Sequence, residues 1–236
     1  NRHLVGWQGG LQADAYGGYN DLYRGNRDPG PVSSALCWSH ARRKFFELAD
    51  IKEKARKKKP DHDISPVALE AVKRIDAIFD IEREINGLDV GMRLEVRRHR
   101  SQPLVEALHD WMQRERDTMS RHNPVAKAIT YMVKKDRWDA FARFLDDGRV
   151  CLTNNAAERA LRGVALGRKS WLFAGSERGG DRAAFMYSMI VTAKMNDIDP
   201  QAWLADILCR LPDMTASQVP DLLPWNWAPT RQRMAA

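Results

Sequence analysis

The strongest constraint on the fold is a run of helical periodicity between residues 64 and 147. Apolar side chains recur there at intervals of three or four residues, beginning with Val72, Ile75, Ile78, Phe79 and Ile85. Ser65-Pro66 and Asn123-Pro124 are typical helix starts, because Ser and Asn cap free N–H groups and Pro loses no hydrogen bond at the first helical position. The pattern predicts a block of helices.

The acids of this block alternate with apolar residues at helical spacing, as at Glu70, Glu82, Glu84 and Glu106. Such spacing is typical of solvated helix faces around an apolar seam. We therefore expect no converging metal site within the block.

Two short strands precede the helices. Gly10–Asp14 predicts a strand that delivers Asp14 at its carboxyl end, and Ser34–Trp38 predicts a second strand that runs into a helix over Ala41–Ala49. The basic run Lys52–Lys59 predicts a solvated helix end or a linker.

The chain beyond the block predicts further helices. One starts near Asn154, and Ala183–Met195 is apolar nearly all round, which predicts a buried helix. Gly175–Gly180 predicts a glycine-rich loop between them, and a last helix is expected around Trp203. The segment Pro220–Ala236 predicts an extended tail that is either pinned by its tryptophans or partly disordered.

The composition favours some classes of binding partner and one cellular compartment over others. Lys and Arg total 38 against 31 Asp and Glu, and the net charge of +7 favours an anionic partner such as nucleic acid or an acidic membrane surface. No apolar run approaches the roughly 20 residues of a membrane helix, so no integral membrane protein is expected. Cys37, Cys151 and Cys209 are too scattered for a disulfide framework, which favours the cytoplasm.

Two carboxylates are candidates for chemistry. Asp14 ends a predicted strand, and Glu158 falls in the first turn of a predicted helix. A fold that brings such acids together can hold two Mg²⁺ ions about 4 Å apart for phosphoryl transfer. The residues alone also allow simpler roles. Asp14 fits a turn former, and Glu158 follows Asn155 at the spacing of a capping box.

Basic residues lie close to both acids in the sequence, which would suit a phosphate backbone; the alternative for each is a solvated helix face. They are Arg42, Arg43, Lys44, Arg159, Arg162, Arg168, Lys169, Arg178 and Arg182. Cys37 and His40 have the spacing of metal ligands, but no second such pair exists. A buried Cys and a positioned His are therefore expected in place of a zinc site.

Four blocks of the sequence stand out as a set. They are Leu11-Gln-Ala-Asp-Ala-Tyr-Gly-Gly-Tyr19, Cys37-Trp-Ser-His-Ala-Arg-Arg-Lys-Phe-Phe46, Leu152-Thr-Asn-Asn-Ala-Ala-Glu-Arg-Ala-Leu-Arg162 and Trp171-Leu-Phe-Ala-Gly-Ser176. In this order they resemble the IS66 family of bacterial insertion-sequence transposases. Leu223-Pro-Trp-Asn-Trp227 is similar to the C-terminal end of that family.

The resemblance implies a DDE-type transposase, in which three acids bind two Mg²⁺ ions, with Mn²⁺ as a substitute, for DNA strand cleavage and transfer. It implies an α/β, ribonuclease-H-like core that is truncated at its N-terminus, with a large all-helical insertion. Asp14 matches the second acid and Glu158 the third, while Cys37 and His40 match a supporting motif. Asn154 and Asn155 would shape the turn before Glu158.

The sequence departs from the family pattern at its start, because no Asp or Glu precedes Asp14. We therefore expect a fragment that lacks the first acid and is inactive by itself. The expected segments are 1–50 (partial core), 51–149 (helical insertion), 150–210 (core helices with Glu158) and 211–236 (tail). Arg97, Arg98 and Arg100 of the insertion are expected to be available to DNA.

The resulting hypothesis is a DNA transposase that acts on transposon ends and target DNA, forms a homo-oligomer, uses accessory proteins of its element and associates with the bacterial nucleoid in the cytoplasm. One alternative is a non-catalytic DNA-binding transposase remnant. Another is a structural metal domain built on Cys37 and His40.

Overall fold

The computed structural model describes residues 4–49, 65–167 and 175–227. The chain divides into two compact units, Asn1–Asn155 and Ala156–Ala236. The residues described are predominantly helical, as the sequence predicts. No described helix is both long and apolar enough to cross a membrane.

The first unit contains a pair of parallel strands. β1 (Gly10–Ala13) pairs with β2 (Ser33–Leu36), with Gly10 opposite Ser33 and Ala13 opposite Leu36. Parallel neighbours need a crossover, and here the connection includes the 3₁₀ helix η2 (Gly17–Tyr23). Both predicted strands are confirmed. Because these two strands form the whole sheet in the described ranges, a ribonuclease-H-like core stays a prediction.

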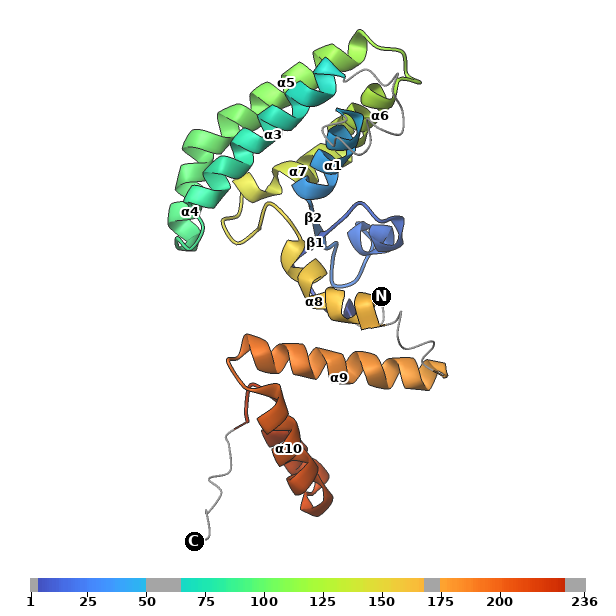
Figure 1. Ribbon diagram of the computed structural model, residues 1–236, viewed down its shortest axis with the longest axis vertical. Coiled ribbons are helices and arrows are strands. Elements are labelled where there is room, and N and C mark those ends of the chain that lie inside the picture. Colours follow the sequence, from blue (N-terminus) through green and yellow to red (C-terminus); the bar gives the residue numbers. More distant parts are fainter. Residues whose placement is uncertain (1–3, 50–64, 168–174, 228–236) are drawn as a thin grey trace. The chain divides into compact units, whose positions relative to one another are not determined.

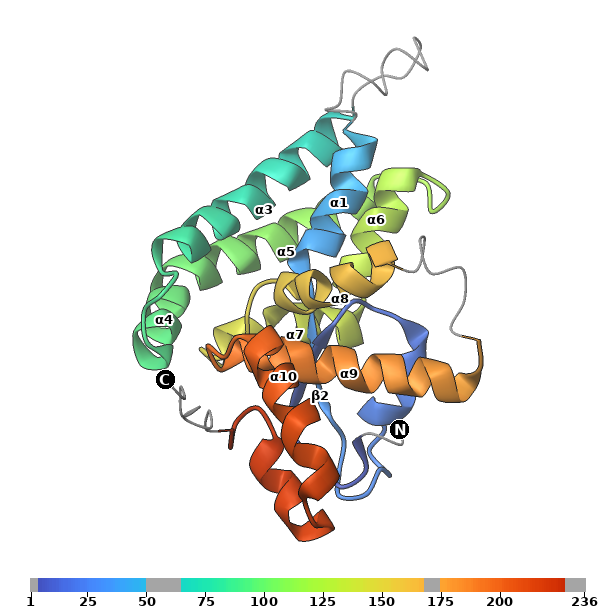
Figure 2. The ribbon, with the colours of Figure 1, turned by 60° about the horizontal axis from the view of Figure 1, so that its bottom comes forward.

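The predicted helical block is confirmed. Its elements are α3 (Pro66–Glu84), α4 (Val90–Val96), the π-helix η3 (Arg97–Ser101), α5 (Gln102–Asp117), α6 (Pro124–Val133), α7 (Lys135–Ala142) and the 3₁₀ helix η4 (Arg143–Leu145), and α1 (Trp38–Leu48) precedes the block. After α4 the chain turns, and α5 runs back alongside α3 (Figure 1, Figure 2). Helix α1 begins at Trp38, three residues before the predicted start.

Local capping explains where two of these helices begin. The Ser65 hydroxyl accepts a hydrogen bond from the Ala68 N–H at 3.2 Å, and the Asn123 side chain accepts one from the Val125 N–H at 2.8 Å. A proline follows each capping residue. Both predicted helix starts are therefore confirmed with their expected mechanism.

Trp38 lies at the centre of the first unit's hydrophobic core. Its side chain is fully buried, and its ring meets Phe141 and Phe144 edge-on at centroid distances of 5.7 and 5.9 Å. Its indole N–H donates to the Phe141 carbonyl at 2.9 Å. The strand pair, α1 and the later helices thus share one core. The predicted division into four segments stays a prediction.

A buried arginine corrects two sequence predictions. The Arg97 side chain is 1% exposed and donates to both carboxylate oxygens of Glu82 at 2.7 Å. It also donates to the carbonyls of Phe144 at 3.1 Å and Val150 at 2.9 Å. The prediction that Arg97 is available to DNA is wrong, and so is the solvated position of Glu82, which is 14% exposed. Their mutual pairing satisfies the charges that burial removes from water.

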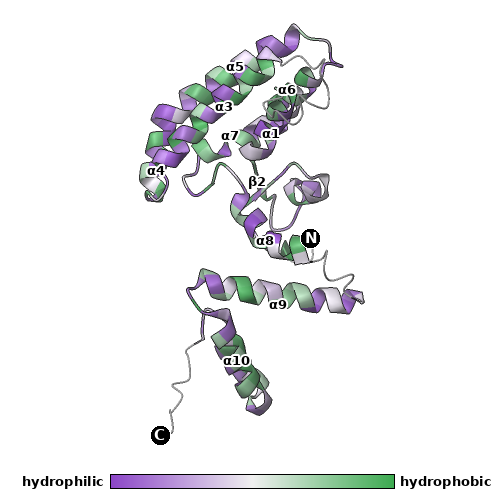
Figure 3. Ribbon diagram, in the orientation of Figure 1, coloured by the Kyte–Doolittle hydropathy of each residue, from purple (hydrophilic) through white to green (hydrophobic). Residues whose placement is uncertain are grey.

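The second unit consists of short and long helices. α8 spans Asn155–Gly167, α9 spans Glu177–Met195 and α10 spans Pro200–Arg210, followed by the 3₁₀ helices η5 (Leu211–Asp213) and η6 (Ala216–Leu222). Apolar residues are distributed along both α9 and α10 (Figure 3). The helix around Trp203 is confirmed.

Two predictions about α9 are wrong. The predicted glycine-rich loop is its first turn, because Ser176 caps the helix by accepting from the Gly179 N–H at 3.0 Å. The helix is also not buried, since Ala193 is its only buried residue and Phe185 is 59% exposed. A helix with apolar residues on all sides is expected to be buried. Burial also requires neighbouring elements that cover each face of the helix, and the sequence of the helix does not show whether they exist.

Tryptophans hold the end of the described chain. The Trp203 indole N–H donates to the Leu222 carbonyl at 2.9 Å, and that of Trp227 donates to the Asp206 carboxylate at 2.8 Å. The predicted pinning of the tail is confirmed as far as Trp227, although Pro220–Leu222 is helical and not extended. Residues 228–236 and the basic run Lys52–Lys59 lie outside the described residues.

Candidate active site

Asp14 stands directly after the paired end of β1. The Cys37 N–H donates to the Ala13 carbonyl at 3.2 Å, so the strand pair is closed up to the residue before Asp14. The Asp14 side chain is exposed. No described residue forms an ion pair with it. The structure therefore presents an accessible carboxylate at the carboxyl end of a parallel strand.

The charge of Asp14 affects the pKa of two tyrosines that come from different elements. Burial raises the pKa of Tyr131 on α6; the nearby Arg137 charge opposes this shift, and Asp14 adds to it. Burial also raises the pKa of Tyr23, and the charges of Tyr19 and Asp14 add smaller contributions in the same direction. Both phenols therefore stay protonated at neutral pH beside the carboxylate.

The segment that leads to α8 is attached at this end of the strands. The Gln12 side-chain amide donates to the Cys151 carbonyl, and the Trp38 N–H donates to the Leu152 carbonyl at 3.1 Å. Glu158 follows Leu152 by six residues in the sequence. The chain is thus fixed beside β1 and β2 shortly before α8 begins.

Glu158 is the fourth residue of α8 and is exposed. It belongs to the second unit, whereas Asp14 belongs to the first. Asn154 and Asn155 are half-buried at the end of the first unit, and Asn155 is the first residue of α8. The convergence of Asp14 and Glu158, and the roles of the two asparagines, stay predictions.

The predicted DNA-binding residues differ in how much of their charge is engaged. Arg42 donates to both oxygens of Asp76, at 2.5 and 2.8 Å, and the Lys44 ammonium lies 4.5 Å from the centroid of the Tyr131 ring. Five others are exposed: Arg43, Arg159, Arg162, Arg178 and Arg182. Arg168 and Lys169 lie outside the described residues.

Cys37 and His40 lie on one turn at the start of α1. Cys37 precedes the helix and is buried, as predicted, and His40 is half-buried. Within the parts of the chain that the structure describes, no three His, Cys, Asp or Glu residues gather as a metal site, and all three cysteines are free thiols.

Sequence reasoning missed Gln12 and Tyr131, which adjoin the strand end. Gln12 precedes Asp14 by two residues, so the alternation of a strand places both on one face, and this signal was present in the sequence. Tyr131 gave no such signal, because it comes from a helix more than a hundred residues away.

Comparison with known proteins decides the family. Residues 1–182 match the model of the "Transposase IS66 family", and residues 188–225 match the "IS66 C-terminal element". The chain belongs to the IS66 transposase family. The match covers both Asp14 and Glu158 and confirms the resemblance seen in the four sequence blocks.

Relatives in Sinorhizobium fredii extend along nearly the whole chain. The uncharacterized protein y4hP is 54% identical over 227 residues, which is 96% of this chain and 41% of the relative. The uncharacterized protein y4jD is 36% identical over 100% of this chain and 44% of its own length. This chain thus spans less than half the length of these relatives. No solved structure matches it.

Proposed function

We propose that this chain carries two of the catalytic acids of a DDE-type transposase, which cleaves DNA strands and joins them to a target. Asp14 and Glu158 would hold Mg²⁺, or Mn²⁺ in its place. The observation that carries this proposal is the position of Asp14, exposed at the end of a parallel strand, within a region that matches the transposase model.

The chemistry of the two side chains fits a hard divalent cation. Carboxylate oxygens are preferred ligands of Mg²⁺. No ion pair among the described residues competes for Asp14, and the backbone up to the preceding residue, Ala13, is held by the strand pair. When bound, a pair of such ions would activate the attacking water or 3′-hydroxyl and would stabilise the negative charge that develops on the phosphate oxygens.

The rest of the proposal concerns what the residues of this chain contribute. Asp14 and Glu158 position the ions, and the exposed arginines beside Glu158, Arg159 and Arg162, contact the DNA backbone. The resemblance implies one further acid, which residues 1–13 do not contain. The isolated chain is therefore expected to bind DNA without cleaving it. Homo-oligomer formation, accessory proteins and a place at the nucleoid remain predictions.

Metal binding by the chain itself tests the proposal. Mn²⁺ bound to the purified chain is measured by electron paramagnetic resonance, with Asp14→Asn and Glu158→Gln as variants. The matched controls are Asp139→Asn, an exposed acid on α7, and Glu177→Gln, an exposed acid in the first turn of α9. We expect each site variant to weaken Mn²⁺ binding at least about tenfold, because each removes one of few ligands.

The controls should bind Mn²⁺ as the unaltered chain does. If Asp14→Asn and Glu158→Gln also bind Mn²⁺ normally, neither acid is a ligand and the catalytic proposal fails. DNA binding that persists in such a protein without any metal would favour the non-catalytic remnant instead.

A further inference from the structure

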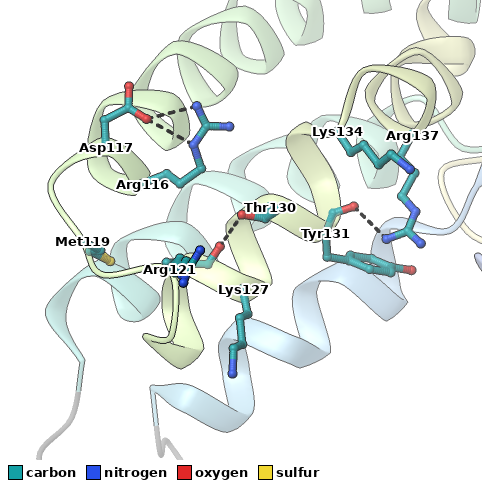
Figure 4. Close-up of a pocket in the computed structure, with 10 residues that line it drawn as sticks. Arg116, Asp117, Met119, Arg121, Lys127, Thr130, Tyr131, Lys134 and Arg137 are labelled. Carbon is teal, nitrogen blue, oxygen red and sulfur yellow. Dashed lines mark hydrogen bonds and ion pairs between the residues drawn. The ribbon is translucent and has the colours of Figure 1, made fainter.

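A basic groove lies on the first unit, away from the predicted DNA-binding residues in the sequence. Its volume is about 620 Å³. Five basic side chains and one acid line it, drawn from the end of α5, the following loop, α6 and the start of α7 (Figure 4). The basic residues are Arg116, Arg121, Lys127, Lys134 and Arg137, and the acid is Asp117.

Three of these five cations have charge available for a ligand. Arg121, Lys127 and Lys134 are exposed and form no ion pair with any residue in the described ranges. Arg116 is paired with Asp117 at 3.0 Å. Arg137 lies 4.7 Å from the Tyr131 ring centroid and donates to the Tyr131 carbonyl at 3.4 Å. The single acid is thus already neutralised.

The groove adjoins the candidate active site through Tyr131. This residue lines the groove, and its phenol lies close enough to Asp14 and the Ala15 backbone for both to act on its ionisation. Lys44 on α1 lies over the same ring. All of these residues belong to the first unit, so their arrangement is internal to it.

We propose that this groove binds the sugar-phosphate backbone of duplex DNA beside Asp14. The proposal deepens the proposed function by placing a substrate-binding surface next to its strand-end acid. The groove is open. Its unpaired cations are Arg121 in the loop before α6, Lys127 on α6 and Lys134 directly after the helix. Such a spread matches a row of phosphates, which carry one charge per roughly 1.7 Å of duplex axis, better than one compact anion.

A charge-matched pair of double variants tests the groove. Lys127→Ala/Lys134→Ala removes two groove cations, and Lys73→Ala/Lys194→Ala removes two exposed cations that do not line it. Binding of the full chain to a fluorescent 30-base-pair duplex is measured between about 50 and 200 mM salt. Each lost phosphate contact should lower the slope of log K against log salt by about 0.9, so the groove variant should lose about two units.

A third variant, Lys127→Arg/Lys134→Arg, keeps both charges and should restore the slope, which guards against a mere loss of folding. Equal losses in the groove variant and its control would overturn the proposal, because binding would then depend only on net charge. Competition by inorganic pyrophosphate at concentrations far below those of simple salt screening would also overturn it, in favour of a small-anion site.

The variants of Asp14 and of the groove, measured in both binding assays, distinguish the groove proposal from the catalytic proposal. Asp14→Asn should retain the salt slope of the unaltered chain, and the groove variant should retain Mn²⁺ binding. Failure of Mn²⁺ binding at Asp14 would leave a groove-specific loss of DNA affinity standing, and loss of the groove effect would leave the metal site standing.

Discussion

The two units of this chain differ sharply in how they bury their apolar side chains. The first unit surrounds Trp38 with fully buried aromatic and aliphatic residues. Among the described residues of the second unit, the buried hydrophobic ones are Ala193, Trp203 and Leu222, and none of them lies on α8. Each unit carries one candidate acid. Burial therefore fixes the backbone that presents Asp14, whereas it does not fix the helix that presents Glu158.

The buried pair of Arg97 and Glu82 shows what the first unit depends on. Arg97 links α3 to the carbonyls of Phe144 and Val150, near the segment that leads toward α8. The nearby pair of Arg100 and Glu84 has the same chemistry but lies in solvent. Identical residue types thus have a structural role in one pair and almost none in the other.

The largest expected effect is that of Arg97→Ala, which should lower the free energy of unfolding by about 3–5 kcal/mol, because it leaves a partly buried carboxylate and several carbonyls without a donor. Urea unfolding followed by circular dichroism measures this loss. Arg100→Ala is the control and should leave the midpoint nearly unchanged, since an exposed ion pair contributes little.

Replacing both partners, as in Glu82→Leu/Arg97→Met, should recover much of the lost stability by removing the unpaired charge. If Arg97→Ala were as stable as Arg100→Ala, the buried pair would not support the first unit and the comparison between the two pairs would fail.

A smaller effect is expected in the second unit. Trp203→Ala should lower the free energy of unfolding by about 3 kcal/mol, the low end of the range for a buried aromatic side chain, because it removes a side chain that is 3% exposed and whose indole N–H donates to the Leu222 carbonyl. Hydrogen exchange should quicken in α10 and η6 and stay unchanged in α1 and α6. Phe141→Ala is the counterpart in the first unit and should quicken exchange in α1, α6 and α7. Equal changes in both units after either substitution would show that they unfold together.

The smallest expected effect is on how the stability of the chain falls at acid pH. A hydrogen bond from the Arg149 side chain, helped by its backbone N–H, lowers the pKa of Asp147 to about 2 from its usual 3.8. Since the folded pKa is the lower one, this stabilisation is present above about pH 4 and is lost as the pH falls toward 2. Urea midpoints should therefore drop less steeply between pH 4 and pH 2 in Asp147→Asn than in the unaltered chain. Identical slopes would contradict the assignment.

Local signals in the sequence account for much of the fold. The caps at Ser65 and Asn123 and the strand that ends before Asp14 follow from neighbouring residues, and all three are confirmed. The burial of Arg97 had no local signal, because its partners lie 15 residues before it and about 50 residues after it. The exposure of α9 was equally hidden, since a helix's own composition does not reveal what covers it.

The candidate site likewise has one part that the sequence predicts and one part that it does not. The family blocks and the strand end singled out Asp14, but the groove escaped notice because its cations are scattered among apolar residues from Arg116 to Arg137. One signal was available. Lys127, Thr130 and Lys134 recur at intervals of three and four residues, which places them along one helix face.

The proposed function requires Asp14 and Glu158 to belong to one two-ion site. Backbone amide NMR of the chain, titrated with substoichiometric Mn²⁺, tests it directly, because the paramagnetic ion broadens nearby signals. We expect amides around Asp14 and around Glu158 to broaden together, and we expect Asp14→Asn to abolish the broadening at both segments. Broadening confined to one segment, or broadening around Glu158 that survives Asp14→Asn, would contradict it.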